Sequence, residues 1–465
     1  MLDAVVVGSG PNRLAVAWTL AQAGLDVEVF ERDPQLGGGM RTDTWGDNYR
    51  ADWGSAVHPM ALASPFFKSV RLADRVEFVV PEASFAHPLP TGAAVAWQSA
   101  QRTAADLGRD GRRWLRLVGG LTNQVEALVE GALTSPLSLP ARPIAAASLA
   151  AATLQGVMGA GLRSLGAQAL LAGVVGHTIG RQPALGASAA GAVLLALAHT
   201  VGWPIPIGGS QAIADVVVGD LRRWGVRLTT DTHVDSIEDL PQARAYFFDT
   251  SARHFLQIVA DRVTPGYRRG LARLRAGNAV SKVDFVTSAP IPWRSPEVGL
   301  AGSVHLCGTR EDIWRAEDEV ARGRHAERPM IVLSQPSTFD GTRVPEGMHS
   351  IWAYAHVPAG STVPQTAVIE DAIERYAPGF RDTILAVRTT NAAQIGARNP
   401  TMPGGDFASG AVTLRQILAR PNLRRAPWLA GDGLYLCSTA TFPGPGVHGM
   451  AGYGAARHAL RSTFA

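Results

Sequence analysis

Two glycine-rich runs near the start of the chain contain the residues that point most directly to chemistry. The first run, Gly8-Ser9-Gly10-Pro11-Asn12-Arg13, lies between a Val-rich stretch and a helix-like stretch. Glycines at its first two positions allow a tight turn and let backbone N–H groups approach a pyrophosphate at a helix N-terminus. Glu31 ends the next apolar stretch, where an acidic side chain binds ribose hydroxyls. This spacing predicts a dinucleotide site formed by Gly8, Gly10, Pro11, Asn12, Glu31 and Arg32.

Arg13 departs from the dinucleotide pattern. It stands where a third glycine normally lets the helix and the strand pack closely. A long side chain there must point outward or push the helix away from the strand, and a guanidinium is also able to face phosphate. The favoured expectation is an exposed Arg13, and in either case the departure weakens cofactor affinity.

The second run, Leu36-Gly37-Gly38-Gly39-Met40-Arg41-Thr42, contains a GGxxRT pattern soon after the ribose acid. It resembles the two-dinucleotide-binding-domain flavoproteins, a superfamily that includes the amine oxidases and the phytoene desaturases. The resemblance implies that the dinucleotide is FAD, with Gly37, Gly38 and Arg41 near its pyrophosphate and flavin. An NAD-only Rossmann domain would not need this second glycine cluster.

The C-terminal segment Pro443-Gly444-Pro445-Gly446-Val447-His448-Gly449-Met450 is similar to the flavin-proximal motif of the phytoene dehydrogenase-like branch, which includes the pyridine nucleotide-disulfide oxidoreductase-domain proteins. The resemblance implies that Gly446, Val447, Gly449 and Met450 bind the flavin, where N–H groups at a helix N-terminus stabilise charge on the reduced ring. His448 is a candidate on the flavin side, and an ordinary loop histidine is the alternative. Ser438 and Pro445 depart from the pattern.

Further matches extend the resemblance over essentially the whole chain, at residues 52–59, 203–214, 247–251, 282–284 and 399–406. By this resemblance Val234, in a strand predicted over residues 233–237, contacts the adenine end of FAD. Lys282 resembles the amine oxidase lysine that holds a water near flavin N5. The alternative for Lys282 is an edge-strand lysine that pairs with Asp284 on the same face.

The candidate catalytic residues are therefore Lys282, His58 and His448. His58 lies in a matched motif, and its apolar surroundings also suit a core histidine whose hydrogen bonds are satisfied. The same core interpretation is favoured for His177 and His199. No metal site is predicted, because Cys307 and Cys437 lie far apart without zinc-ligand spacing.

These residues must be positioned by alternating strands and helices. Residues 2–31 read as a βαβ unit, followed later by a helix over 212–224 and strands at 226–228, 245–248 and 434–437. A separate, mostly antiparallel sheet is predicted from residues 279–287, 303–306, 330–333 and 350–356. We therefore predict an α/β fold in which a Rossmann-like FAD-binding domain (1–70, 204–260 and 426–465) is interleaved with an α+β substrate domain (71–203 and 261–425).

Residues 131–214 form the most unusual stretch, because they carry only the formal charges of Arg142, Arg163 and Arg181. Residues 143–162 and 183–214 are uncharged apart from histidine and long enough to raise the question of a membrane span. Both are rich in Ala, Gly and Ser, and Pro204 and Pro206 break the second. Buried helices are the favoured reading, compatible with helices that line an apolar substrate tunnel or touch a membrane surface.

The overall composition excludes several classes of protein. The chain has 465 residues, of which 46% are hydrophobic and 18% charged, so it is not disordered and can bury large cores. The net charge of +4 comes from scattered arginines, which gives nucleic-acid binding little support. The start of the sequence lacks a basic leader segment, which predicts a cytoplasmic protein. A peripheral membrane contact and a homo-oligomer stay open.

The residues and the resemblance together predict an FAD-dependent oxidoreductase. The expected reaction moves a hydride from a hydrophobic, isoprenoid or lipid-like substrate to flavin N5 with loss of a neighbouring proton, as in a desaturase or dehydrogenase. One alternative is amine oxidation or a redox-neutral double-bond isomerisation. Another is a flavin-free relative that acts as a binding or assembly subunit, which the departures at Arg13, Ser438 and Pro445 keep open.

Overall fold

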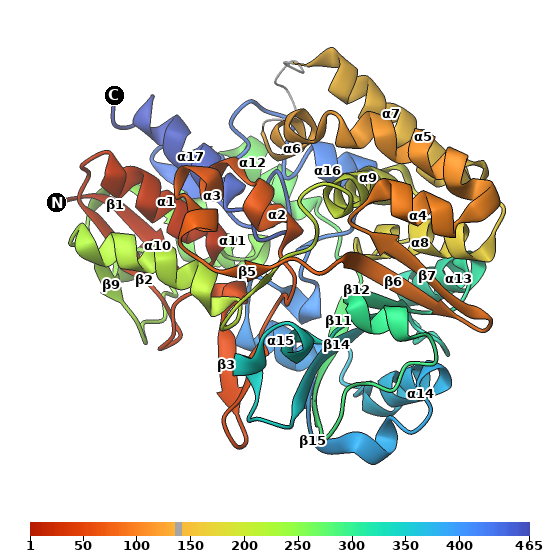
Figure 1. The fold of residues 1–465 in the computed structure, drawn as a ribbon. Helices are drawn as coiled ribbons and strands as arrows, with labels where there is room; N and C mark the ends of the chain where they lie inside the picture. The colour runs from red at the N-terminus through yellow and green to blue at the C-terminus, as the bar shows by residue number, and fades with distance from the viewer. Residues whose placement is uncertain (135–141) are drawn as a thin grey trace.

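The first glycine motif follows β1 (Figure 1), which is one strand of a six-stranded sheet. The computed structural model describes residues 1–134 and 142–465. The strand order is β16-β17-β10-β1-β2-β9, with parallel pairs except between β16 and β17. The strands come from all three segments predicted to form the cofactor domain: β1 (Leu2–Val7), β2 (Val27–Phe30), β9 (Arg227–Thr229), β10 (Ala243–Phe248), β16 (Leu429–Gly431) and β17 (Leu434–Leu436).

Helices cover both faces of this sheet. Side chains alternate along a strand, so Val6 of β1 packs in one core with α1 (Pro11–Gln22), α10 (Gln211–Arg223) and α17 (Met450–Leu460). Val5 packs in another core, with α11 (Ala252–Val259) and α12 (Pro265–Ala272). Burial on both faces explains the unbroken apolar run of β1. The predicted α/β class with a Rossmann-like unit is confirmed.

The strand predicted over residues 233–237 is wrong. β9 ends at Thr229, and Val234 lies in an irregular stretch before the short 3₁₀ helix Ile237–Asp239. Asp231 has a φ of 54°, which turns the backbone away from the sheet. Ser236 then caps the 3₁₀ helix through its side chain. These two local turns compete successfully with the alternating pattern that favoured a strand.

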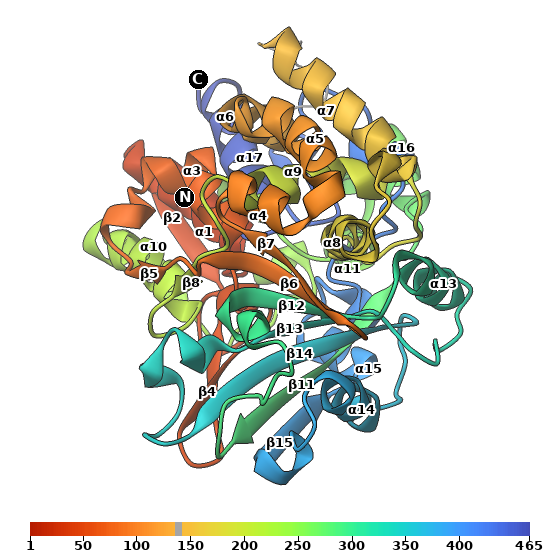
Figure 2. The ribbon, with the colours of Figure 1, turned by 45° about the vertical axis from the view of Figure 1, so that its right-hand side comes forward.

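A seven-stranded sheet forms the second layer, as Figure 2 shows from the side. Its order is β15-β11-β14-β13-β12-β6-β7, and its pairs are antiparallel except β6–β12. The predicted antiparallel sheet is therefore present, with three further strands that the sequence patterns did not indicate. Its strands are β6 (Ala83–Leu89), β7 (Gly92–Trp97), β11 (Ala279–Thr287), β12 (Ala301–Leu306), β13 (Ile331–Ser334), β14 (His349–Val357) and β15 (Ile384–Thr390).

The interior strand β11 shows how this sheet divides its faces. Val283 and Phe285 pack against α14 (Thr366–Tyr376) on one side. Val280 and Lys282, which alternate with them, line a cavity on the other side. Because β11 is hydrogen-bonded to β14 and to β15, the edge-strand explanation for Lys282 is wrong.

A layer of apolar helices stands beside β6 and β7 (Figure 2). It includes most of the stretch of few charges. The buried helix predicted over residues 183–214 is confirmed, because α9 is buried along most of its length. The buried helix predicted over residues 143–162 is wrong, because α7 buries only Ala145, Ala152 and Thr153 and leaves Ile144 and Leu154 exposed. None of the described helices combines the length and apolar character needed to cross a membrane. The layer consists of α4 (Ala100–Asp106), α5 (Gly111–Thr122), α6 (Val125–Leu133), α7 (Pro143–Val157), α8 (Leu165–Gly176) and α9 (Leu185–Ala198).

Short elements complete the fold and connect the layers. Two small antiparallel pairs join β3 to β4 and β5 to β8. Their bounds and those of the remaining helices are β3 (Thr42–Trp45), β4 (Tyr49–Asp52), β5 (Phe78–Val79), β8 (Ile205–Pro206), α2 (Pro59–Ala63), α3 (Pro65–Ser69), α13 (Arg310–Ala321), α15 (Ala392–Arg398) and α16 (Leu414–Leu418).

Arg343 is a fully buried cation between the two sheets. Its Nη1 lies 2.6 Å from Asp52 Oδ2, and its Nε lies 2.5 Å from Asp340 Oδ2. Nη2 also donates to the carbonyl of Pro206 at 3.2 Å. Burial acts to raise the pKa of Asp52, but Arg343, the Ser210 N–H and Thr42 outweigh it and lower that pKa. Both carboxylates thus stay charged around the guanidinium.

Arg343→Met should lower the free energy of unfolding by about 3–5 kcal/mol, because two buried carboxylates would lose their cation. The measurement is urea unfolding followed by far-UV circular dichroism. Lys68→Met is the matched control, since it removes only the exposed Lys68–Glu126 pair and should cost at most about 1 kcal/mol. Equal losses in the two variants would contradict the structural role of Arg343.

Candidate functional site

A cavity of about 870 Å³ takes its wall from loops that follow strands of the six-stranded sheet, from the seven-stranded sheet and from the helical layer. The glycine motifs contribute Gly10 and Gly38, and the C-terminal loop contributes Gly446. β11, β13 and β14 supply Lys282, Val332 and Trp352, while α6, α7 and α9 supply mainly alanine, leucine and valine. Residues that are far apart in sequence thus meet around one space.

The two glycine runs touch each other at one end of this cavity. A Cβ on Gly38 would lie 2.7 Å from Gly10 Cα, so neither run tolerates a side chain there. Ser9 Oγ donates to Glu31 Oε2 at 2.6 Å and accepts from the Gly37 N–H at 3.0 Å. The serine therefore links the first motif, the predicted ribose acid and the second motif in one hydrogen-bonded unit.

The cavity wall contains only some of the residues predicted to bind the cofactor. Gly10, Pro11, Asn12, Gly38, Gly446 and Val447 line it. The other predicted residues lie outside its wall: Gly8, Glu31, Arg32, Gly37, Arg41, Val234, Gly449 and Met450. The residues assigned to the pyrophosphate and the flavin are thus close to the cavity, whereas those assigned to ribose and adenine are not part of it.

Arg13 is buried, so the expectation of an exposed side chain is wrong. Its guanidinium folds back over the first glycine turn, where Nη1 lies 1.3 Å from the position a Cβ on Gly8 would take. Nε lies 3.4 Å from Asp249 Oδ2, at the end of β10. Burial raises the pKa of Asp249, and Arg13 opposes that rise. The missing third glycine has therefore been replaced by an internal ion pair.

The residues at the predicted ribose end already have protein partners. Glu31 Oε1 accepts the Asp33 N–H at 3.0 Å, in addition to the bond from Ser9 to its other oxygen. The Arg32 guanidinium donates to the carbonyl of Arg398. Arg41 Nη1 forms an ion pair with Asp33 at 2.5 Å. The polar groups at the predicted ribose end are therefore already bound by other residues of the chain.

The three candidate catalytic residues do meet in the cavity wall. Lys282 Nζ lies 2.5 Å from Asp284 Oδ1, so the predicted Lys–Asp pair is present. Burial lowers the pKa of Lys282, and Asp284 opposes this effect. His58 Nε2 lies 2.7 Å from Ser210 Oγ. His448 Nδ1 accepts the Met450 N–H at 3.1 Å, which places the proton of the neutral ring on Nε2.

Several buried polar atoms of this wall lack a hydrogen-bond partner among the described residues. Among the described residues, Asn12 Oδ1, His58 Nδ1 and His448 Nε2 are buried without a hydrogen bond. Unsatisfied buried polar atoms are costly, so a bound polar group would be stabilised by them. The flavin half of the predicted cofactor therefore fits this wall. The adenosine half does not fit, because the side chains of Arg13 and Asp249 lie between the cavity and Glu31.

The other two histidines behave differently from each other. His199 Nδ1 lies 2.8 Å from the carbonyl of Trp97, and its Nε2 accepts from Trp114 at 3.1 Å, so the core interpretation is confirmed. His177 instead lines the cavity, and its Nε2 lies 2.6 Å from Nε2 of the buried His305. Sequence analysis missed His305, although it occupies an inward position on a strand that was predicted.

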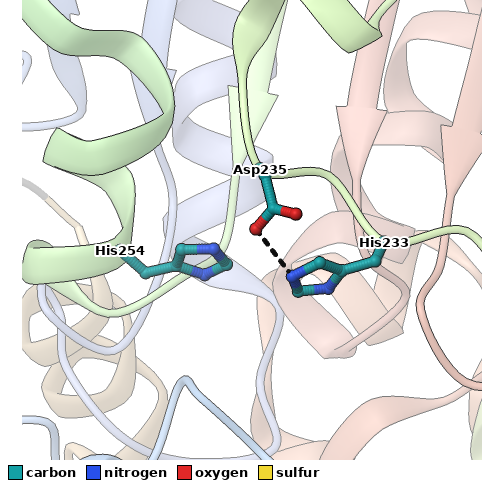
Figure 3. A group of neighbouring side chains, drawn as sticks. All are labelled: His233, Asp235 and His254. Atoms are coloured by element: carbon teal, nitrogen blue, oxygen red, sulfur yellow. Dashed lines mark ion pairs between the residues drawn. The ribbon is translucent and has the colours of Figure 1, made fainter.

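A second group of ionisable residues lies outside the cavity. Figure 3 shows His233, Asp235 and His254, whose candidate ligand atoms all lie within 4.8 Å of one another. The His-x-Asp spacing was visible in the sequence, but His254 comes from α11. His233 Nε2 and Asp235 Oδ1 form an exposed ion pair at 2.9 Å. His254 Nδ1 is buried without a hydrogen bond in the described part of the chain, and the cluster carries no assignment.

Comparison with known proteins supports the fold. A family model for the NAD(P)-binding Rossmann-like domain matches residues 6–69. Pyridine nucleotide-disulfide oxidoreductase domain-containing protein 2 of Mus musculus is 24% identical over 545 aligned residues, which cover 99% of this chain and 93% of that protein. The likeness spans the whole chain, as the motif matches predicted.

Solved structures share the architecture at low sequence identity. Cyclohexylamine oxidase from Brevibacterium oxydans superposes with a TM-score of 0.61 at 14% identity, covering 99% of this chain and 98% of that one. Wild-type putrescine oxidase bound to putrescine has a TM-score of 0.60 at 17% identity, with 100% and 98% covered. An oxidoreductase from Methanosarcina mazei has a TM-score of 0.60 at 15% identity, with 99% and 100% covered. The chain therefore has a fold found in oxidoreductases, with a Rossmann-like domain.

The stability of the protein should fall as the pH drops from 6.5 toward about 4. Burial lowers the pKa of His58, His199 and His448 from 6.5 to about 4. The unfolded chain therefore binds more protons than the folded chain in this window, so acid favours unfolding. Urea unfolding at several pH values tests this, together with NMR titration of the imidazole signals. Constant stability across the window would contradict the burial of neutral histidines.

Proposed function

We propose that this protein is a flavin-dependent oxidoreductase of the phytoene dehydrogenase-like type, which removes a hydride from a hydrophobic, isoprenoid or lipid-like substrate. The observation that carries the proposal is the continuity of the cavity. One space joins the glycine motifs and His448 to a wall of apolar helices. The mouse relative and the oxidase folds support the oxidoreductase class.

The apolar lobe of the cavity supports the choice of substrate. Its wall includes Leu128, Leu149, Val193 and Leu194 from three neighbouring helices. Burying a hydrocarbon chain there contributes about 0.8 kcal/mol for each CH₂ group. Leu414 and Leu418 of α16 line the cavity and are also exposed, so the lobe reaches the surface between apolar side chains. Such an opening suits a substrate that is carried by lipid or by another apolar phase.

A bound flavin would supply the hydride acceptor, and the chain would supply position and proton transfer. Gly10, Asn12, Gly38, Gly446 and Val447 would hold the flavin and its phosphate end. His448 Nε2–H would donate a hydrogen bond from one side of the wall. His58 is neutral near pH 7, because burial lowers its pKa to about 4. Its Nδ1, which has no hydrogen-bond partner in the described part of the chain, would accept the proton lost beside the departing hydride.

The first experiment is the visible absorption spectrum of the purified protein before and after addition of FAD. Flavin bands that survive gel filtration would support the proposal, and anaerobic bleaching by a polyene or fatty substrate would identify the reaction class. Peroxide release on addition of an amine would instead favour amine oxidation. A protein that binds neither FAD nor riboflavin at high concentration would contradict the proposal and favour a flavin-free binding subunit.

Leu194→Trp should reduce kcat/KM for an apolar substrate at least tenfold, because the larger ring fills the apolar lobe. A tenfold loss corresponds to about 1.4 kcal/mol of transition-state binding. The flavin content should stay unchanged, since Leu194 lies on α9, among the apolar helices. Leu185→Trp is the matched control, because Leu185 is an exposed residue at the start of the same helix. If both variants kept full activity, the substrate would not lie in this lobe.

A further inference from the structure

We infer that the Arg13–Asp249 ion pair is a latch that closes the adenosine half of the dinucleotide site, so that this chain binds FAD weakly until the latch is removed. The inference rests on the proposed function, because it takes a flavin dinucleotide as the ligand. It makes Arg13 the residue that sets cofactor affinity and selectivity in this protein.

The first argument is steric. The hollow between the first glycine turn and the end of β10 is where the missing third glycine would leave room. Arg13 fills it: Nη1, Cζ and Nε lie 1.3, 2.2 and 2.7 Å from the position of a Cβ on Gly8. Asp249 borders the second glycine, with Oδ2 lying 3.3 Å from the position of a Cβ on Gly10. Two charged side chains therefore occupy the space beside the helix N-terminus that a pyrophosphate needs.

The second argument is electrostatic. The Arg13 and Asp249 side chains are 9% and 7% exposed, so each carries its charge in a largely dry environment. If Arg13 swung away to admit the cofactor, Asp249 would stay behind as a buried, unpaired carboxylate. Glu31 lies near enough to act on the titration of Asp249. A diphosphate entering here would thus meet two carboxylates, so an open latch is unfavourable in the natural chain.

The third argument is the extent of the cavity, that is, which of the predicted cofactor-binding residues line it. Arg13 and Asp249 form part of its wall, whereas Glu31, Arg32 and Val234 lie beyond it. The flavin end has the opposite character, because His448 Nε2 is buried there with no partner in the described part of the chain. The site is therefore built to accept the ring system, while its own cation blocks the way to the ribose acid.

The latch is also loosely made. Arg13 Nε and Asp249 Oδ2 are 3.4 Å apart, which is longer than a good charged hydrogen bond. Within the described residues, Arg13 Nε has no hydrogen-bond partner. A pair with this geometry is held by burial and shape more than by directed bonds. Removing the guanidinium together with the charge of Asp249 should therefore open the hollow without leaving a buried, unpaired carboxylate.

The test is a titration of the purified full-length protein with FAD and, separately, with riboflavin, which lacks the pyrophosphate and adenosine. Quenching of flavin fluorescence reports binding without any need for activity. The double variant Arg13→Gly with Asp249→Asn should bind FAD at least tenfold more tightly than the natural chain, while the two should bind riboflavin equally. Asp249→Asn, which removes the repelling charge, should also bind FAD more tightly.

Arg116→Gly is the matched control, because it places the same substitution at an exposed position of α5, away from the cavity. Circular dichroism and melting temperature will show that each variant is folded. Unchanged FAD affinity in the folded double variant would overturn the latch, and weaker affinity would show that Arg13 anchors the pyrophosphate instead. Riboflavin binding would leave the proposed function standing in both cases. Failure of every variant to bind either flavin would overturn the latch and the proposed function together.

Discussion

The buried carboxylate of Asp52 holds together the parts of the molecule on which the site depends. Its Oδ1 accepts from Thr42 at 2.7 Å and from the Ser210 N–H at 2.8 Å, and its Oδ2 pairs with Arg343. Its backbone carbonyl accepts from Trp352 of β14 at 3.0 Å. The carboxylate and the backbone carbonyl of Asp52 therefore hold three segments together: the second glycine run, the N-terminus of α10 and the seven-stranded sheet. His58 joins the network through Ser210.

This network explains why one cavity can draw its wall from such distant segments. A charged group in a dry interior is stable only when its partners are held in place, so each partner fixes the element that carries it. Thr42 fixes the second glycine run to the N-terminus of α10 through the Gln211 N–H, and Trp352 brings the sheet face with Lys282 toward Asp52. The apolar helices then close the remaining side.

The two ends of the site have opposite characters. At the flavin end, buried polar atoms of Asn12 and His448 lack partners among the described residues, and the backbone is rich in glycine. At the adenosine end, Ser9, Asp33 and Arg398 already satisfy the polar groups of Glu31 and Arg32. The same fold thus contains an open half and a filled half.

The sequence by itself determined the local elements and the kind of ligand site, because short-range spacing encodes turns, helices and buried strands. The βαβ unit around Gly8, the helix Met450–Leu460 and most strands of the second sheet were predictable for this reason. Tertiary structure decided what depends on distant partners. Arg13 is buried where it pairs with Asp249 at the end of β10. Lys282 lies on an interior strand because β15 pairs with the outer side of β11. His177 contacts His305 from a neighbouring layer. A local sequence pattern does not specify which distant charge or strand a residue will contact in the folded chain. Those long-range contacts set the chemistry of the site.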